Sequence, residues 1–420
     1  MKLLSLCLSL ILFVSSCGDR IPKDDKKEEK PFSFPPEWEP QQAMWITIHD
    51  QWGDPEFVEM SVAPRLEVVK ALHNHVPVKL LTTSDSLAQV FTERLAGMDV
   101  DTSKVTTIIN PQTTFYLRDP GPIFLTNGEE LKMANWQGID STTLQRRPDM
   151  ALRKAVDDTL AVQYGYDIKN SPLSFDGGAV DVSSNSAISI KDYAVLHNPH
   201  MSLEEIEKEI LDTYGKEQMI WLEGVAMIDE NGLKVDNYWG QAPGGHVDAV
   251  VRFVNDSTIL ATTISEEDKD KNPIAAHDYR IFKGYLEQLK AARRPNGEPY
   301  NIVEIPSPVL NTHLIPVPKE YWPTEELDLL YEDGLPSETD TILVVPALGY
   351  ANFLITNAAV LVAQYWQEGM PESEKAKDEE VVSILQNYFP DREIIGLNPV
   401  GINLSGGGIH CTTQQEPRTD

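Results

Sequence analysis

Short apolar segments alternate with longer amphipathic ones along most of the chain. The short segments are rich in β-branched residues, which favours strands, and the longer ones repeat their apolar residues with a helical period. We predict strands at Met44–Ile48, Val78–Thr82, Lys104–Ile109, Ala187–Ile190, Thr258–Thr262, Asn301–Ile305 and Thr341–Pro346. We predict helices at Pro64–Asn74, Ser84–Ala96, Met150–Tyr164, Ser202–Tyr214, His277–Ala292 and Asp378–Tyr388. This alternation is typical of an α/β protein.

Two of these helices carry local signals for where they begin. Pro64 suits the first helical position, where its missing N–H costs nothing. Ser202 and Glu205 have the spacing of a capping box. No glycine-rich phosphate loop joins a predicted strand to a helix, so the pattern gives little support to nucleotide binding.

The first seventeen residues have the features of an export signal. Lys2 precedes an apolar stretch, Leu3–Phe13, which is too short for a membrane-spanning helix. The small residues before Cys17 resemble a bacterial lipobox, in which this cysteine would be acylated. An ordinary signal peptide cut nearby is the alternative. We therefore expect an exported lipoprotein of the bacterial envelope, periplasmic or surface-facing, with the lipid as its only membrane contact.

The region that follows is charged and then becomes globular in composition. Residues 18–35 contain Lys23-Asp-Asp-Lys-Lys-Glu-Glu-Lys and little to bury, so we predict a disordered tether. We expect residues 36–420 to form a single domain that carries the function. The formal net charge of the chain is −30, which argues against nucleic acid or anionic lipid as partners. It suits cationic ligands, although solubility alone accounts for most of these charges.

One cysteine is the main candidate for chemistry. The chain has three cysteines, and Cys7 and Cys17 lie in the export segment, so Cys411 is the single thiol of the domain. It cannot close a disulfide within the domain, and a structural metal site would need several soft ligands. The preceding glycines 406–408 let the backbone approach a ligand closely. Lone cysteines are often inert, but these surroundings favour a nucleophile.

Glycine pairs recur at intervals and suggest repeated modules. They occur in Phe175-Asp-Gly-Gly-Ala-Val-Asp, Pro243-Gly-Gly-His-Val-Asp and Ser405-Gly-Gly-Gly-Ile-His-Cys, with Arg118-Asp-Pro-Gly-Pro as a looser relative. Each pair leads into an extended stretch that carries polar groups. Repeats of this kind indicate equivalent turns around a pseudo-symmetry axis.

The polar residues of these turns are the next candidates. His246 and Asp248 would share one face of a strand, either as a structural pair or as metal ligands together with His410. Asp119 lies directly after the strand-like stretch Phe115-Tyr-Leu, and for both Asp119 and Asp176 a turn-shaping role is the alternative.

The whole set of polar groups suits one kind of substrate. Asn352 borders an apolar strand, and Trp136 is either a core residue or the wall of a pocket. A thiol, an imidazole and three carboxylates together suit a planar guanidinium, because carboxylates accept its N–H groups in parallel. A thiolate can attack the central carbon, and an imidazole can protonate the ammonia that leaves.

These residues resemble the agmatine deiminase and Porphyromonas-type peptidylarginine deiminase family of guanidine-modifying enzymes. The likeness runs from Pro36-Glu-Trp-Glu-Pro40 to Gln415-Glu-Pro417. Its markers, in order, are Met44-Trp45, Leu117-Arg-Asp-Pro-Gly-Pro122, Asn135-Trp136, Asp176-Gly-Gly178, Gly245-His-Val-Asp248, Arg252-Phe253, Tyr350-Ala-Asn-Phe353 and Gly406-Gly-Gly-Ile-His-Cys411. The resemblance implies a five-bladed pseudo-symmetric α/β propeller (pentein type) with its site at the axis.

The resemblance also implies a role for each candidate. Cys411 matches the nucleophile, His246 the general acid and base, and Asp119 and Asp248 the guanidinium-binding carboxylates. Asp176 stands where the family typically has glutamate. A further departure is Gly408, which replaces the asparagine usually found before Ile-His. The reaction would release ammonia through a covalent cysteine intermediate without a metal or organic cofactor. We expect the carboxylates to raise the pKa of the thiol until a cation binds.

The substrate stays open between agmatine, free arginine and peptidyl-arginine. Export favours a peptide, and Arg146 and Arg147 lie roughly where the peptidyl-type enzyme has arginines for a peptide carboxylate, unless they only begin a helix. The motifs around His246 and Cys411 are closer to the agmatine type. An amidinotransferase and a non-catalytic solute-binding lipoprotein are the rival functions. A papain-like protease has its cysteine and histidine in the reverse order.

Overall fold

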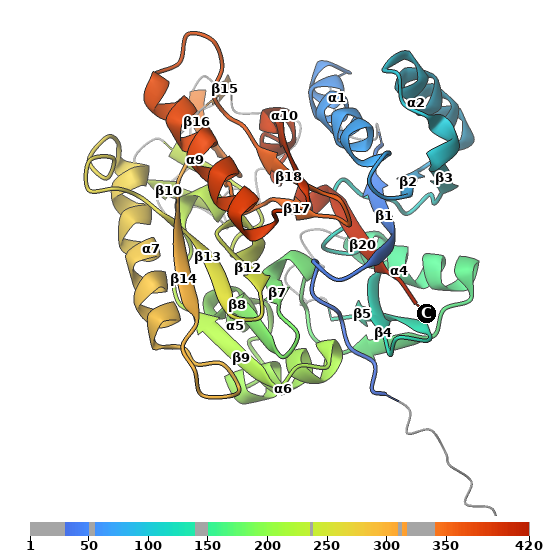
Figure 1. The fold of residues 1–420 in the computed structure, drawn as a ribbon, viewed down its shortest axis with the longest axis horizontal. Coiled ribbons are helices and arrows are strands. Elements are labelled where there is room, and N and C mark those ends of the chain that lie inside the picture. The colour runs from blue at the N-terminus through green and yellow to red at the C-terminus, as the bar shows by residue number, and fades with distance from the viewer. Residues whose placement is uncertain are drawn as a thin grey trace, which may run out of the picture. The chain divides into compact units, whose positions relative to one another are not determined.

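The computed structural model describes residues 30–49, 55–138, 150–235, 238–309, 313–316 and 341–419. Pro31–Asp420 forms one compact unit, and Met1–Lys30 is a separate one. The predicted export segment, Cys17 and most of the predicted tether lie outside the described residues, as do Arg146 and Arg147. Strands and helices alternate through the compact unit, which is therefore an α/β protein, as predicted (Figure 1).

Five of the six sheets in the described part of the chain repeat one arrangement. The first strand runs antiparallel to the second, and the second runs parallel to the third. Four of these sheets use strands that are consecutive in the sequence: β4 (Ile123–Thr126), β5 (Leu131–Trp136) and β6 (Ile168–Ser171); β7 (Val180–Val182), β8 (Ser186–Ile190) and β9 (Gln218–Leu222); β12 (Val251–Asn255), β13 (Thr258–Thr263) and β14 (Asn301–Pro306); β17 (Leu354–Ile355), β18 (Ala359–Ala363) and β19 (Glu393–Leu397).

The fifth repeated sheet joins the two ends of the compact unit. β20 (Thr413–Pro417) runs antiparallel to β1 (Gln41–Thr47), which runs parallel to β2 (Val78–Thr82). β3 (Val105–Ile109) extends this sheet at its edge. Figure 1 shows the red strand β20 beside the blue strand β1. This pairing places the segment before β20, which carries Cys411, in the interior.

The sixth sheet has the same strand directions in its first three strands, but it carries a fourth strand that runs antiparallel at its edge, and no predicted site residue lies directly before it. Its strand order is β10 (Asn231–Val235), β11 (Tyr238–Gln241), β16 (Thr341–Pro346) and β15 (His313–Pro316). Directly after β16, the backbone N–H of Ala347 donates to Asn403, whose side chain donates back to Ala347 and to the carbonyl of Gly407. The sheet is therefore fastened to the glycine loop before Cys411.

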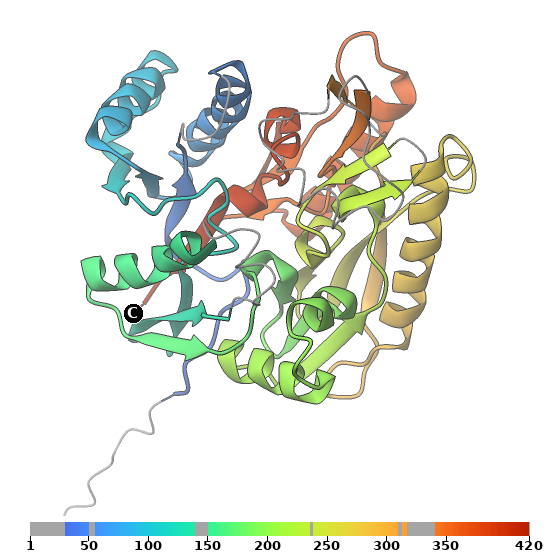
Figure 2. The same cartoon turned by 180° about the vertical axis from the view of Figure 1, so that it is seen from behind.

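Helices pack against the repeated sheets. They are α1 (Pro55–Leu72), α2 (Asp85–Gly97), α4 (Met150–Tyr164), α5 (Lys191–His197), α6 (Leu203–Tyr214), α7 (Pro273–Ala291), α9 (Glu372–Tyr388) and the short α10 (Val400–Asn403). Figure 2, the view from behind, shows the yellow helix α7, which contacts β13 of one repeated sheet and β9 of another. The middle strands β8 and β18 are buried along their full length. No helix in the described residues is long and apolar enough to cross a bilayer.

The helix ends confirm one predicted signal and correct another. Ser202 and Glu205 form the predicted capping box of α6. The prediction for Pro64 is wrong, because α1 begins at Pro55 and Pro64 lies inside it. Proline cannot donate to the carbonyl four residues back, that of Met60. Gly401 of α10 packs against this carbonyl, since a Cβ at Gly401 would lie 2.0 Å from it. The neighbouring helix therefore covers the break.

Two other helices begin earlier than predicted. α7 starts at Pro273, with Asn272 as its cap, and α9 starts at Glu372. Their first turns are mostly polar or contain small residues, so they add little to the apolar period on which the prediction rests. The predicted strands agree with the observed ones to within a few residues.

Candidate active site

Six of the predicted site residues occupy one position in the repeat, just before the first strand of a sheet, whereas Trp136 lies at the end of β5. Asp119 precedes β4, Asp176 precedes β7, His246 and Asp248 precede β12, Asn352 precedes β17, and Cys411 precedes β20. Three of these segments form short 3-10 helices: η2 (Gly177–Ala179), η4 (Val247–Ala249) and η5 (His410–Thr412). The glycine pairs in the sequence mark these turns.

Two local predictions about this region are wrong. His246 and Asp248 do not lie on a strand, because His246 caps η4 and Asp248 lies within it. The stretch Phe115-Tyr-Leu is irregular rather than extended in a sheet, so Asp119 belongs to a turn that follows a loop. The spacing of two residues is compatible with a 3-10 turn as well as a strand, and the sequence alone does not separate them.

His246 lies between two carboxylates. Its Nδ1 is 3.4 Å from Oδ1 of Asp119, and its Nε2 is 3.5 Å from Oδ2 of Asp176. Gly178 lies at the centre of this group, because a Cβ there would be 2.8 Å from Nδ1 of His246, 2.9 Å from Asp119 and 3.2 Å from Oδ2 of Asp248. The missing side chain of Gly178 therefore lets the imidazole and the carboxylates converge.

The carboxylates set the protonation of this imidazole. Burial of the ring disfavours its charged form, but Asp119 and Asp176 outweigh burial and raise the pKa of His246 to about 10. Burial, together with the nearby Asp176 and Asp248, raises the pKa of Asp119 to about 7 despite His246. Near neutral pH the imidazole therefore carries a proton that it can donate.

The thiol of Cys411 is buried beside Asp248 and Asn352. The Nδ2 group of Asn352 donates to Sγ at 3.3 Å, and Sγ lies 3.7 Å from Oδ2 of Asp248. Burial raises the pKa of the thiol well above its usual value, and the Asp248 and Asp119 charges raise it further. This confirms the predicted direction. A cation bound among these carboxylates would reverse their effect and favour the thiolate.

Asp248 has one oxygen engaged and one available. Its Oδ2 lies 2.7 Å from Nδ1 of His410, whereas its buried Oδ1 has no hydrogen-bond partner among the described residues. Burial would raise the pKa of Asp248, but His410, His246 and Arg252 hold it below its usual value. An ionised acceptor with a free oxygen therefore lies next to the thiol.

Exposure shows from which side a ligand can enter. Asp248 is fully buried, whereas the side chains of Asp119 and Asp176 are 17% and 25% exposed. The Tyr193 hydroxyl donates to Oδ2 of Asp176 at 2.7 Å, and its ring packs edge-on against His246. The open side of the site is therefore the one that carries Asp119 and Asp176.

The contacts of Trp136 show where it lies, and the contacts of His410 bear on the predicted metal site. Trp136 is buried against Phe175 and Tyr214, so it lies in the core behind the segment of Asp176. Both ring nitrogens of His410 face carboxylates of this chain. Among the described residues, no group of three or more His, Cys, Asp or Glu side chains is arranged to hold a metal ion.

Sequence reasoning assigned no function to several residues around the site. The sequence assigns no role to Glu37 or Tyr193, and it offers His410 only as a metal ligand. Glu37 lies in the marker Pro36-Glu-Trp-Glu-Pro40, and His410 lies in the cysteine motif. Their place inside these two markers is the signal in the sequence that points to Glu37 and His410.

The departure at Gly408 fits the position of Asn352. A Cβ at Gly408 would lie 2.2 Å from Oδ1 of Asn352, an oxygen that accepts from the backbone N–H of His410. We expect Gly408→Ala to displace Asn352 and the thiol and to lower kcat by roughly 10²-fold. Steady-state kinetics would measure this, with Gly284→Ala in α7, which meets no atom within 4 Å, as the control. Wild-type kcat in Gly408→Ala would contradict this placement.

The fold and the site together define an α/β protein with a buried thiol, an imidazole and carboxylates arranged around a space for a planar cation. Residues 33–417 match the sequence model of the Porphyromonas-type peptidyl-arginine deiminase family. The chain therefore belongs to this family.

Similar proteins include agmatine deiminases. That of Pseudomonas aeruginosa is 27% identical over 407 residues, covering 92% of this chain and 95% of that protein. The solved agmatine deiminase of Enterococcus faecalis has a TM-score of 0.69 at 23% identity, covering 93% of this chain and 96% of that one. A substrate-bound cysteine-to-serine variant of the C. jejuni agmatine deiminase has a TM-score of 0.67 at 19% identity, covering 93% and 97%.

Proposed function

We propose that this protein hydrolyses a guanidinium group, releases ammonia and acts on agmatine. The observation that carries the proposal is the convergence of His246, Asp119 and Asp248 at Gly178, with the thiol of Cys411 beside Asp248. Family membership and the agmatine deiminases among its relatives support the same reaction. In this proposal Asp176 and Asn352 complete the site, and residues 36–420 are one catalytic domain.

The reaction proceeds through a covalent intermediate. Asp119 and Asp248 accept the N–H groups of the guanidinium, whose charge favours the Cys411 thiolate. Sulfur bonds to the guanidinium carbon, and His246 gives its proton to the nitrogen that leaves as ammonia. His246, now neutral, takes a proton from water as the hydroxide adds to the same carbon. The C–S bond then breaks and the hydroxyl proton passes to solvent, which releases the neutral ureido product and regenerates the thiolate.

The charges at the open side favour agmatine over substrates with a carboxylate. Asp119 and Asp176 line this side, and they would attract an ammonium tail and repel a carboxylate. Arg118 and Arg252 are already held by Gln415, Glu37 and Asp181. These two arginines are therefore engaged elsewhere. Free arginine and peptidyl-arginine are alternative outcomes of the test.

The acid side of the pH profile tests the role of Asp119. Only the ionised carboxylate can accept from the guanidinium, and the pKa of Asp119 is about 7. We expect kcat/KM, which reports ionisations of the free enzyme and free substrate, to fall as pH drops through about 7. Asp119→Asn should lower kcat/KM and remove this decline. A decline that persists unchanged in Asp119→Asn would assign it to another group.

Ammonia release tests the proposal as a whole. The chain without residues 1–17 would be assayed with agmatine, arginine and a peptide that ends in arginine, each with and without an added amine. We expect ammonia and a ureido product from agmatine without the amine. Turnover of another guanidine would change the substrate, and a strict need for an amine would indicate an amidinotransferase. Folded protein that turns over none would leave the solute-binding function.

We also propose that the five repeated sheets are the blades of a five-bladed pseudo-symmetric propeller around the site. The position of the site residues before each first strand supports this. A crystal structure in which the five sheets do not surround Cys411 would contradict it.

The proposed cellular location is the bacterial envelope, with the chain anchored through lipid on Cys17. The motif before Cys17 supports this proposal. Cys17→Ser should move the protein from the membrane fraction to the soluble fraction. A wild-type protein found only in the soluble fraction would refute the anchor.

A further inference from the structure

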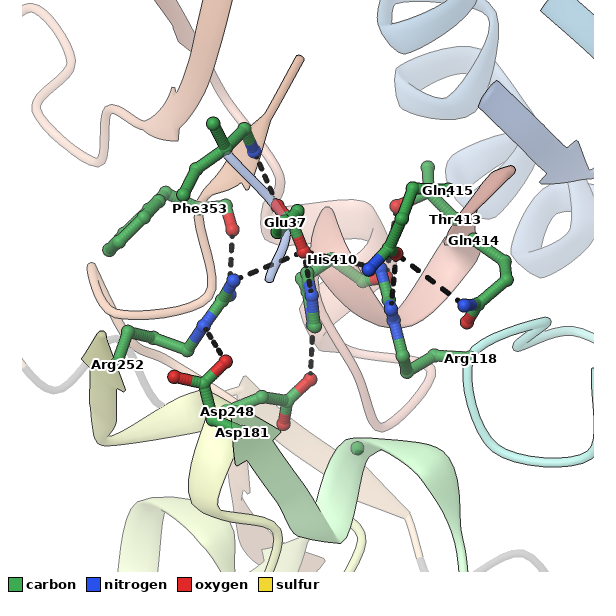
Figure 3. A network of polar contacts seen from close by, with 12 residues as sticks. Glu37, Arg118, Asp181, Asp248, Arg252, Phe353, His410, Thr413, Gln414 and Gln415 are labelled. Carbon is green, nitrogen blue, oxygen red and sulfur yellow. Dashed lines mark hydrogen bonds and ion pairs between the residues drawn. The ribbon is translucent and has the colours of Figure 1, made fainter. Parts of the chain in front are cut away.

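A buried histidine beside the nucleophile bridges two carboxylates (Figure 3). Nδ1 of His410 lies 2.7 Å from Oδ2 of Asp248, and Nε2 lies 2.6 Å from Oε2 of Glu37. Burial would raise the pKa of Glu37, but His410, Arg252 and Arg118 hold it well below its usual range. An ionised carboxylate only accepts hydrogen bonds. The geometry gives each ring nitrogen of His410 a carboxylate acceptor, which suits a ring that donates from both nitrogens.

Glu37 is fixed in place from several directions. It accepts from the backbone N–H of Ile355 and from Nη2 of Arg252, and Nη2 of Arg118 lies 3.6 Å away. Arg252 in turn donates to Asp181 at 2.9 Å. Three carboxylates thus face two arginines and the His410 ring in the protein interior, and this pairing offsets the cost of burying the charges. Figure 3 shows Glu37 between His410 and Arg252.

We propose that Glu37 and His410 are positioning residues, which keep Asp248 ionised and leave its Oδ1 free for the substrate guanidinium. This inference rests on the proposed function. Asp119 provides the contrast, because it is also buried among carboxylates, its imidazole neighbour His246 lies farther away at 3.4 Å, and its pKa is raised to about 7. Without His410, Asp248 would be expected to take up a proton in the same way and lose an acceptor.

Several other charged or titratable groups face Asp248 and must be counted in any pH dependence. They come from the turn before β4, from η3 (Met227–Asp229), from the N-cap of η4, from β12 and from η5: Arg118, Asp119, Asp229, His246, Arg252, His410 and Cys411. Glu37→Gln removes the negative charge that faces His410 and the ion pairs of Glu37 with Arg252 and Arg118. Arg252 keeps its ion pair with Asp181, and Arg118 keeps its hydrogen bond to Gln415.

The test measures agmatine binding by calorimetry in a Cys411→Ala background, across a range of pH. If Asp248 stays ionised in only about one molecule in ten of Glu37→Gln, agmatine binding near neutral pH should weaken by about tenfold. Because a higher pH ionises Asp248 again, the difference in agmatine affinity between Glu37→Gln and the Cys411→Ala background should shrink as pH rises. Glu39→Gln is the matched control, since Glu39 is exposed in the same turn. Its affinity should equal that of the background at every pH.

Two outcomes would overturn the proposal. They are unchanged affinity in Glu37→Gln, and a loss of the same size at every pH, which would indicate a structural role. A second measurement needs no Glu37 variant: nitrogen NMR of histidine-labelled protein, with His410 assigned from His410→Asn. It should show two protonated ring nitrogens at neutral pH, and a neutral ring would refute the inference. Folded protein that binds no guanidine would refute the proposed function, while the NMR result still decides the state of His410.

Discussion

Replacement of Cys411 by alanine is expected to lower ammonia release by roughly 10⁴-fold or more. Cys411 is the one thiol of the domain, and Asp248 and Asn352 contact its Sγ directly. The alternative nucleophile is water, which would have to attack a guanidinium carbon without a covalent step. Asp119 and Asp248 cannot replace Cys411 as nucleophile, because both carboxylates are needed to bind the substrate.

The controls for Cys411→Ala separate chemistry from folding and binding. The lost sulfur is small, so the circular dichroism spectrum should match that of the wild type. Cys411→Ser should also be inactive, because a serine hydroxyl beside carboxylates does not ionise. Both variants should still bind agmatine in calorimetry, since Asp119 and Asp248 are intact. Substantial ammonia release by folded Cys411→Ala would contradict the nucleophile.

His246→Asn is expected to lower kcat by roughly 10²- to 10⁴-fold, the range for loss of a general acid. The imidazolium lies between Asp119 and Asp176, and its raised pKa of about 10 keeps it protonated through neutral pH. Without it, the leaving nitrogen has no placed proton donor. The same change removes a positive charge beside Asp119, so the pKa of this carboxyl should rise and the acid decline of kcat/KM should begin at a higher pH.

Single-turnover kinetics would separate these two effects of His246→Asn. At a pH well above the acid decline, Asp119 is ionised and the remaining loss reports proton donation. His200→Asn, at an exposed turn, is the matched control and should keep wild-type kcat. A His246→Asn enzyme within a factor of about three of wild type would rule out His246 as the proton donor.

The sequence predicts the chemical groups better than their local geometry. The glycine pairs and the single thiol point to Cys411, His246, Asp119, Asp176 and Asp248, and the structure brings all five together. The strand Val78–Thr82 is predicted because it is a short, mostly apolar run between two helix-like stretches. The 3-10 helix at Val247–Ala249 is missed because a spacing of two residues also suits a strand.

Long-range contacts are what the sequence cannot supply. Glu37 and His410 are 373 residues apart, and they meet because β20 pairs with β1. Neither residue has a local pattern that distinguishes a buried ion pair from a surface charge. The fit of Gly408 against Asn352 likewise depends on two separate segments that meet only in the folded chain.

The covalent intermediate is the most direct test of the central claim, that Cys411 attacks a guanidinium carbon. Wild-type protein would be mixed with excess agmatine, quenched in acid within one turnover, digested and weighed by mass spectrometry. We predict that the peptide containing Cys411 gains the mass of agmatine less one ammonia. We also predict no such gain in Cys411→Ser. Continued turnover of agmatine with the Cys411 peptide unmodified at every quench time would contradict a covalent mechanism.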